Sequence, residues 1–233
     1  MSPRRAGAAA FALLLFAGFA ALGTWQLQRR TWKLDLIARI EQRAHAPPVP
    51  APGPQRWPSV SAATDEYLRV RVTGEFLHEH ETPVQASTEL GSGFWVLTPL
   101  RVADGTVVLV NRGFVAPERR ERAVRITDEP NGETTVTGLL RISEPDSGLL
   151  GLLRHNDAAA NRWYWRDVQA IAAARGLTRT APYFVDADAT SRSEPVGGLT
   201  VIAFHNNHLV YAITWYALAL MAAAAAWQIV RKP

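Results

Sequence analysis

The segment HNNHLVYAITWY, residues 205–216, decides how this chain folds, because it leads directly into an apolar run that continues to Ile229. No charged residue lies between Leu209 and Val230. About 20 such residues, at about 1.5 Å rise per residue, cross a hydrocarbon core of about 30 Å. We therefore expect a membrane-spanning helix over 209–230. Two imidazoles and two amides are costly to place at a membrane edge, so this segment is also a candidate functional site.

A second uncharged run, Ala6 to Thr24, predicts another membrane-spanning helix over 6–27. Basic residues followed by apolar and small residues also fit a cleaved secretory signal. The helical pattern nevertheless continues without a breaker through Trp25 to Lys33, which favours a permanent anchor.

The charges next to the two runs predict the orientation in the membrane. Arg231 and Lys232 follow the second run, and Arg4 and Arg5 precede the first. Because positive charge accumulates on the cytoplasmic side, both termini are expected there. The segment 28–204 then forms a periplasmic domain of a bacterial inner-membrane protein, or faces the intermembrane space in a mitochondrial setting.

The composition of the chain excludes several classes of function. The 233 residues include no cysteine, which rules out disulfides, thiolate metal sites and cysteine nucleophiles. The pI is about 9.8, but the net charge is only +4, and no aromatic-basic RNA motif is present, so nucleic acid is not an expected partner. Neither a Gly-rich phosphate loop nor a G-x-S-x-G or H-E-x-x-H motif occurs, so the sequence does not indicate an enzyme.

The middle of the chain is predicted to be a β-rich domain. An amphipathic helix continues the first run to about Arg43, and a Pro-rich segment, 46–58, is expected to be an extended linker. Alternation with a period of two and turn signals predict strands over 67–73, 82–86, 94–101, 106–114, 134–141 and 183–186, with a break at Pro99 and a hairpin at 103–105. A helix is expected from Asp167 to Gly176. The fold class is therefore membrane α+β, with two helices flanking an antiparallel sheet that can curl into a small barrel.

The histidines of the opening segment have the spacing of a ligand site. His205 and His208 are three residues apart and share a helical face if the helix includes them, and Tyr211 and Trp215 extend that face. An imidazole can ligate iron, and aromatic rings can line a flat apolar ligand, so haem fits these properties together. The alternative is an interfacial belt, because Trp and Tyr concentrate at bilayer edges.

Two further groups of residues have two interpretations each. His78 and His80 could hold a metal if they lie on a strand, or they could belong to a solvated turn beside Glu79 and Glu81. Arg112 ends a strand, where its guanidinium could bind a carboxylate such as a haem propionate, or close the hairpin through an internal ion pair.

Five segments together make the chain resemble the Surfeit locus protein 1 family of cytochrome c oxidase assembly factors. They are Gly23-Thr24-Trp25-Gln26 with Arg29 and Lys33, Val72 to Phe76, Gly93 to Leu100, Val110 to Val115, and Asn206 to Leu209 with Trp215-Tyr216. Together these segments span nearly the whole chain, and their order and spacing make the resemblance specific. Phe114 and Ala116 depart from the family pattern, in which Trp and Pro are usual.

This resemblance implies a membrane protein that binds haem a transiently and helps to insert it into the large subunit of the haem-copper oxidase. The family's haem-binding histidine matches His208, whereas His205 lies outside the matching block. Arg29, Arg30 and Lys33 are expected to pair with the haem propionates. Haem a synthase is a second candidate partner, besides the lipid bilayer. The alternative is a scaffold that stabilises an oxidase assembly intermediate without binding haem.

Small residues form a stripe on the second apolar run and suggest a helix contact. Ala219, Ala222, Ala223 and Ala226 allow close approach of another helix. Its partner could be the first run, through Gly18 and Ala21, or a helix of the oxidase. The alternative is simply an alanine-rich span.

Overall fold

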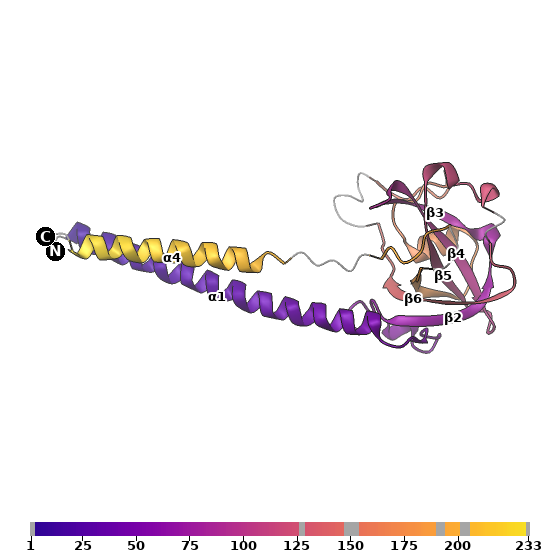
Figure 1. Ribbon diagram of the computed structural model, residues 1–233, viewed down its shortest axis with the longest axis horizontal. Helices are drawn as coiled ribbons and strands as arrows, with labels where there is room; N and C mark the ends of the chain where they lie inside the picture. The colour runs from indigo at the N-terminus through magenta and orange to yellow at the C-terminus, as the bar shows by residue number, and fades with distance from the viewer. Residues whose placement is uncertain (1–2, 126–128, 147–153, 190–193, 201–205, 232–233) are drawn as a thin grey trace. The chain divides into compact units, whose positions relative to one another are not determined.

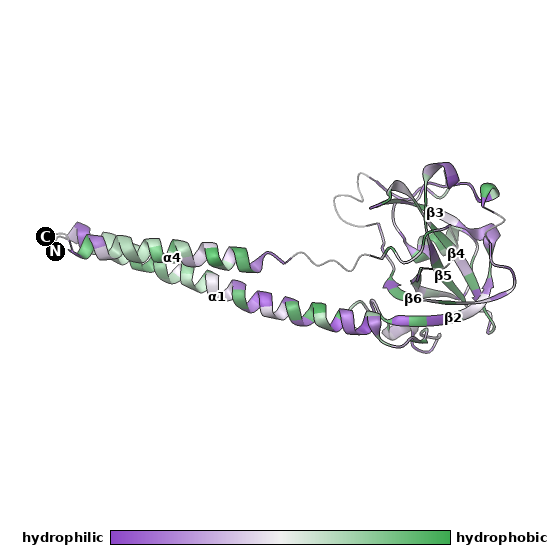
Figure 2. Ribbon diagram, in the orientation of Figure 1, coloured by the Kyte–Doolittle hydropathy of each residue, from purple (hydrophilic) through white to green (hydrophobic). Residues whose placement is uncertain are grey.

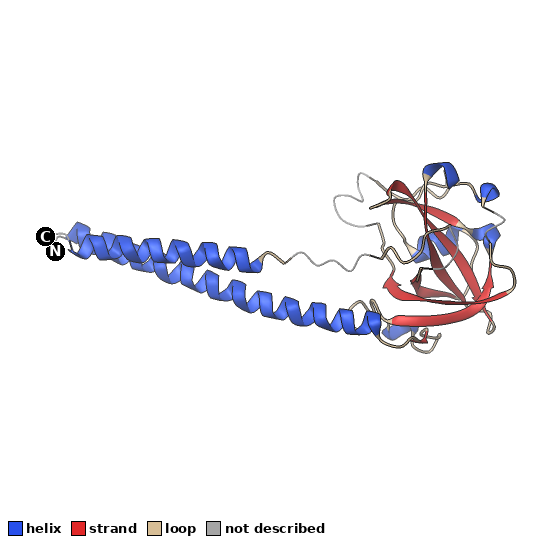
Figure 3. Ribbon diagram, viewed as in Figure 1, coloured by secondary structure: helices blue, strands red, loops and turns tan. Residues whose placement is uncertain are grey.

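A computed structural model describes residues 3–125, 129–146, 154–189, 194–200 and 206–231. These residues form two compact units, each described by itself below: a two-helix unit, from the chain's first 39 residues and those after 201, and a β-domain, residues 40–201. Figure 3 shows the long helices of the first and the strands of the second.

Both apolar runs are helical, as expected. α1 extends over Pro3–His45 without interruption and α4 over His208–Arg231. By length and composition, both can cross a membrane. Figure 2 shows hydrophobic residues along α4 and the first half of α1, with hydrophilic residues mixed into the remainder of α1. The uninterrupted α1 confirms that the first apolar run continues into the amphipathic helix predicted to end near Arg43.

Five strands of the β-domain close into a barrel. They are β2 (Arg69–Phe76), β4 (Gly91–Val102), β5 (Val107–Val115), β6 (Glu133–Ile142) and β7 (Thr180–Ala187). Their order is β2-β6-β7-β5-β4, and a β2–β4 pairing closes the ring. All pairs in the ring are antiparallel except β5–β7. This Greek-key connectivity is that of five-stranded OB-type barrels, a fold that by itself specifies no function. The predicted class, two helices flanking a barrel-like sheet, is confirmed.

Three shorter pieces complete the β-domain. β3 (Thr82–Thr88) pairs antiparallel with the first half of β4, and β1 (Val49–Pro50) lies parallel to β2. α3 (Val168–Ala174) begins at Asp167, whose side chain accepts hydrogen bonds from the backbone N–H groups of Gln169 and Ala170. The helix predicted from Asp167 to Gly176 is thus present, with a left-handed glycine (φ 65°) after its end.

Alternation along the strands produces two hydrophobic clusters. On β5, Val108 and Val110 point into the barrel, while Leu109 points outward. The outward side packs under α3 around Trp163 and Ile171. β5 is therefore buried on both faces, which explains why its sequence reads as a continuous apolar run.

The strands match the predicted ones to within a few residues, but the predicted end at Gly74 and the predicted break at Pro99 are both wrong. β2 continues through Gly74, where an added Cβ would lie 2.2 Å from the carbonyl oxygen of Arg101. The glycine is required because β2 meets β4 there and closes the barrel. β4 does not break at Pro99, whose carbonyl accepts a hydrogen bond from the N–H of Leu77 at 2.8 Å.

The Pro-rich segment packs on the barrel. Its residues include β1, and the carbonyl of Pro52 accepts hydrogen bonds from the indole of Trp57 at 2.9 Å and the hydroxyl of Tyr183 at 2.7 Å. The side chain of Tyr183 is buried in the barrel core. This hydroxyl therefore joins the segment that follows α1 to β7.

We expect Tyr183→Phe to lower the free energy of unfolding by about 1 kcal/mol, the usual net contribution of such a hydrogen bond. Burial raises the pKa of the Tyr183 hydroxyl above its ordinary value of about 10. When the pKa of a group is higher in the folded than in the unfolded state, the group's contribution to stability is fully present below the unfolded-state pKa. Above that pKa the fold loses stability as the pH rises. Unfolding by urea should therefore show that wild type loses stability above about pH 10 more steeply than Tyr183→Phe.

Tyr164→Phe is the matched control, because no hydrogen bond from the Tyr164 hydroxyl is present among the described residues. Equal stability of the two variants at neutral pH would contradict the assigned role of Tyr183.

Candidate functional site

α1 and α4 pack antiparallel, with the first turn of α1 and the last turn of α4 at the same end (Figure 1). Ala212, Ala219 and Ala226 of α4 are buried in the two-helix unit, one every seven residues. Small residues at this repeat allow close packing without large side chains at the contact. Ala219 and Ala226 of the predicted alanine stripe therefore lie in an interface with α1, whereas Ala222 and Ala223 are only half-buried.

The residues that α1 contributes to this interface differ from those predicted. Gly18 and Ala21 are exposed, whereas Ala9, Ala12 and Gly23 are buried. The helical repeat explains the difference, because 9, 12 and 23 lie on one face of an α-helix and 18 and 21 lie off it.

His208 lies where both apolar runs end, at the first residue of α4. Its Nδ1 is 2.7 Å from Oε1 of Gln26 on α1. Among the described residues, no hydrogen bond involves Nε2, which leaves that nitrogen available to a ligand. The imidazole is half-buried. His205, the other predicted histidine of this segment, lies outside the described residues.

A second polar contact joins the helices close by. The hydroxyls of Thr24 and Tyr216 are 3.0 Å apart. At Gly23 an added Cβ would lie 3.0 Å from the ring of Tyr216, so the absence of a side chain there lets the ring approach α1 closely. Two of the segments that carry the family resemblance, 23–26 and 206–216, thus meet in space.

The two aromatic residues predicted to line a ligand differ in their surroundings. Tyr211 is 54% exposed. Trp215 is half-buried and stacks on Phe19 of α1, with ring centroids 5.7 Å apart. Trp215 therefore contributes to helix packing, and the open aromatic ring one turn from His208 is that of Tyr211.

The predicted basic cluster divides between two sides of α1. Arg30 and Lys33 follow Gln26 by four and seven residues, which places them on its face, and both are half-buried. Arg29 is exposed, and its guanidinium lies 4.0 Å from the ring centroid of Trp32. Arg30 and Lys33 therefore extend the face of α1 that carries Gln26, the partner of His208.

Arg112 has the internal ion pair that was one of its two interpretations. It lies on β5 in the β-domain, where its guanidinium is 3.8 Å from the carboxylate of Glu81. Both side chains are buried, and Arg112 also lies over the ring of Phe76 at 5.5 Å. This geometry gives Arg112 a structural partner within its own unit.

The second pair of histidines forms a short 3-10 turn, His78–His80. His78 is mostly buried: Nε2 donates to the carbonyl of Pro130 at 3.0 Å, and Nδ1 lies 3.8 Å from Glu129. No group of three His, Cys, Asp or Glu side chains suited to a metal occurs in the part of the chain that the structure describes. The expectation of a fully solvated turn is wrong for His78, because its ring packs against Phe76.

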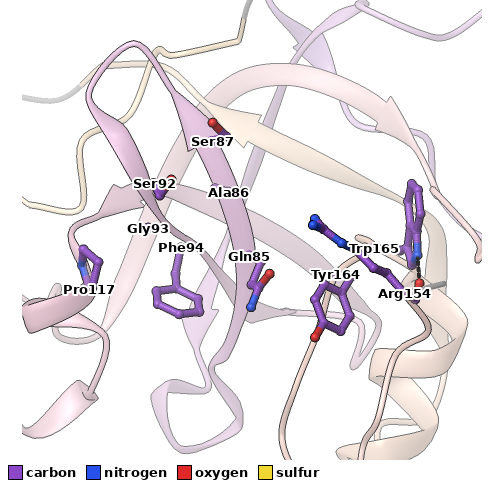
Figure 4. Close-up of a pocket in the computed structure, with 10 residues that line it drawn as sticks. All are labelled: Gln85, Ala86, Ser87, Ser92, Gly93, Phe94, Pro117, Arg154, Tyr164 and Trp165. Atoms are coloured by element: carbon purple, nitrogen blue, oxygen red, sulfur yellow. Dashed lines mark hydrogen bonds between the residues drawn. The ribbon is translucent and has the colours of Figure 1, made fainter. Parts of the chain in front are cut away.

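The β-domain has a cleft of about 720 Å³ beside the β3–β4 hairpin. Figure 4 shows Phe94 and Tyr164 on either side of Gln85, with Arg154 and Trp165 next to Tyr164. The indole of Trp165 donates to the carbonyl of Arg154 at 2.7 Å. None of the residues that line the cleft is a histidine, so the cleft lacks the imidazole that the site on α4 offers.

Gln26, Thr24 and Tyr216 are residues whose contacts the sequence reasoning did not predict. The available signal was chemical: an amide and two hydroxyls at the end of an apolar run need partners, since unpaired polar groups are costly there. Which groups pair depends on the antiparallel helix register, which the local sequence does not contain.

The fold and this polar helix end define a protein with two candidate membrane spans around a β-barrel domain. The SURF1 family model matches residues 13–220. Surfeit locus protein 1 of Mus musculus is 36% identical over 226 residues, covering 89% of this chain and 71% of that protein. For Homo sapiens the identity is 36%, with 84% and 69% covered, and for Takifugu rubripes 34%, with 89% and 90% covered. The chain belongs to the SURF1 family, which confirms the resemblance.

Proposed function

We propose that this protein is an assembly factor for haem-copper cytochrome c oxidase that binds haem a transiently and aids its insertion into the large oxidase subunit. The observation that carries the proposal is the position of His208. Its imidazole lies at the first residue of α4, beside the end of the apolar run of α1, with Nδ1 bonded to Gln26 and Nε2 without a partner among the described residues.

The residues around His208 suit haem a as cargo. Neutral imidazole nitrogen is a common axial ligand of haem iron. Tyr211 presents an open ring one turn along α4, on which the macrocycle can rest. Arg30 and Lys33 lie on the Gln26 face of α1 and offer cations to the propionates. Arg29 is a second cation nearby in sequence, while Arg112 is engaged by Glu81.

The family supports the oxidase as the destination, and the apolar helices support a site in the bilayer. We infer that both termini are cytoplasmic and that the β-domain is periplasmic in a bacterial inner membrane, following the charges that flank the spans. Such a protein acts by binding and release, not as an enzyme. Besides the large subunit, haem a synthase is a candidate partner, since the cargo is its product.

The proposal is tested by purifying the full-length protein from a host that makes haem a and recording its absorption spectrum. Wild type is expected to carry haem, and His208→Ala is expected to lose the Soret band because the axial ligand is gone. His155→Ala is the control, since this exposed histidine lies in the β-domain. An unchanged spectrum in His208→Ala would remove the proposal's support.

The alternative is a scaffold that holds an oxidase intermediate without binding haem. Stacking of Trp215 on Phe19 is the observation in its favour, because that ring already serves helix packing. A scaffold should co-purify with the large subunit from cells unable to make haem a. A haem carrier should lose that association together with its cargo.

A further inference from the structure

The hydrogen bond between His208 and Gln26 determines more than the position of the ring. A neutral imidazole carries its proton on one nitrogen and a lone pair on the other. The atom of Gln26 that faces Nδ1 is the amide oxygen, at 2.7 Å, and an oxygen can only accept. The proton must therefore be on Nδ1, and Nε2 must present the lone pair.

We propose that Gln26 is a positioning residue that holds His208 in the Nδ1–H tautomer and makes Nε2 its only iron-binding nitrogen. The proposal rests on the function proposed above. It also adds a residue of α1 that contacts the histidine itself, whereas the sequence predicted only propionate-binding cations on that helix. Histidines that ligate metals usually donate their other ring N–H to an oxygen acceptor in this way.

Contacts of the residues just before Gln26 fix the register of α1 against α4. Three residues before it, Gly23 lies against the ring of Tyr216, and Thr24 bonds to the hydroxyl of the same tyrosine. One turn further back, Phe19 stacks on Trp215. Because contacts on both helices fix the register, the amide oxygen meets His208 without ordering a loop, as a preorganised site requires.

An amide also suits a cargo that has to leave. A carboxylate would form a charge-assisted bond, roughly twice as strong as a neutral one, and would increase the basicity of the imidazole. The iron–nitrogen bond would then be stronger and release slower. The neutral amide of Gln26 orients the ring without that increase.

The first test needs no haem. Nitrogen-15 NMR of full-length protein labelled at histidine reports the tautomer of His208, with His208→Ala assigning the signal. Wild type is expected to show Nδ1–H, and Gln26→Leu to shift the population toward Nε2–H, which a free imidazole side chain prefers. An Nε2–H signal in wild type, or an unchanged signal in Gln26→Leu, would overturn the proposal.

Two controls separate Gln26 from the packing of the helices. Gln28→Leu removes an exposed glutamine from the same helix. Thr24→Val removes the other interhelical hydrogen bond without touching His208. Both are expected to retain the wild-type tautomer. If Thr24→Val shifted it as far as Gln26→Leu, helix packing would set the tautomer and the proposal would fail.

The second test measures haem a. Gln26→Leu is expected to weaken haem a binding by about 10- to 100-fold, the usual effect of removing a partner of a metal ligand. Gln26→Glu should slow release and lower the iron midpoint potential. If His208→Ala binds haem a as wild type does, the proposed function fails whatever the NMR shows. If His208→Ala loses haem a while Gln26→Leu retains it at full affinity, the role of Gln26 fails alone.

Discussion

Asp186→Ala is expected to lower the free energy of unfolding by about 3–5 kcal/mol, the cost of leaving buried charges without their partner. The carboxylate of Asp186 is buried on β7 and accepts from Arg141 at 3.0 Å and Arg166 at 3.2 Å. It also accepts from Asn111 at 2.8 Å and Thr200 at 3.0 Å. Removing it leaves four donors that were arranged around one acid.

The two arginines make this loss severe. Their side chains are only 13% and 14% exposed. Burial lowers the pKa of Arg141, but the charge of Asp186 and further acidic neighbours outweigh it and raise the pKa above its ordinary value. Arg141 also stays charged when Asp186 is removed, because a guanidinium remains protonated in proteins. Glu144 remains bound to Arg166 at 2.6 Å. Arg141 keeps only longer pairs, with Glu144 at 3.4 Å and Glu66 at 3.5 Å.

Chemical denaturation of the full-length protein in detergent measures the effect. Asp188→Ala is the matched control, because Asp188 lies just past the end of the same strand and forms one half-exposed pair with Arg69. It should cost no more than about 1 kcal/mol. Equal losses for the two variants would show that the Asp186 network contributes no more than a surface pair.

The same network shows what the sequence could and could not predict. The strands can be predicted from the local sequence. In β5, for example, Val108, Leu109 and Val110 indicate a buried strand whatever they pack against. The clustering of Asp186 with Arg141 and Arg166 is not visible, since it arises only when β6, β7 and the segment before α3 are brought together. Charged residues spread along a chain look like a solvated surface until the fold collects them.

Closure of the barrel and the contact between Gln26 and His208 also depend on segments that are far apart in the sequence. Gly74 looked like the end of a strand, whereas its missing side chain lets β2 meet β4. His208 is a candidate from the sequence alone, because an imidazole at the start of an apolar run is unusual by itself. Gln26 could not be paired with it, since that requires the antiparallel register of α1 and α4. For Arg112, chemistry leaves two partners open, and the structure adds that Glu81 lies beside it.

Arg125→Met is the second variant for which we expect a loss of about 3–5 kcal/mol in the free energy of unfolding. The side chain of Arg125 is 1% exposed and pairs with Glu81, which is 5% exposed. Its guanidinium also donates to the carbonyl of Arg119 at 2.6 Å and that of Arg120 at 3.1 Å. It thereby fastens the segment after β5 to the turn before β3.

Methionine fills a similar volume but donates no hydrogen bond, so two carbonyls and a buried carboxylate lose their donor. Arg112 remains beside Glu81 at 3.8 Å, which is too far for a direct hydrogen bond. Thermal or urea unfolding should show the loss. Arg162→Met is the control, because its ion pair with Asp157 is on the surface, and it should unfold like wild type.

The double variant Arg125→Met with Glu81→Met separates the charge effect from packing. When both members of a buried ion pair become apolar residues of similar volume, much of the lost stability usually returns, because no uncompensated charge remains. We expect the double variant to be more stable than Arg125→Met alone, although Arg112 then loses the carboxylate of Glu81, which limits the recovery. A double variant less stable than Arg125→Met would mean that Glu81 stabilises the domain mainly through Arg112. The Glu81–Arg112 pair, and not Glu81–Arg125, would then be the more important one for stability.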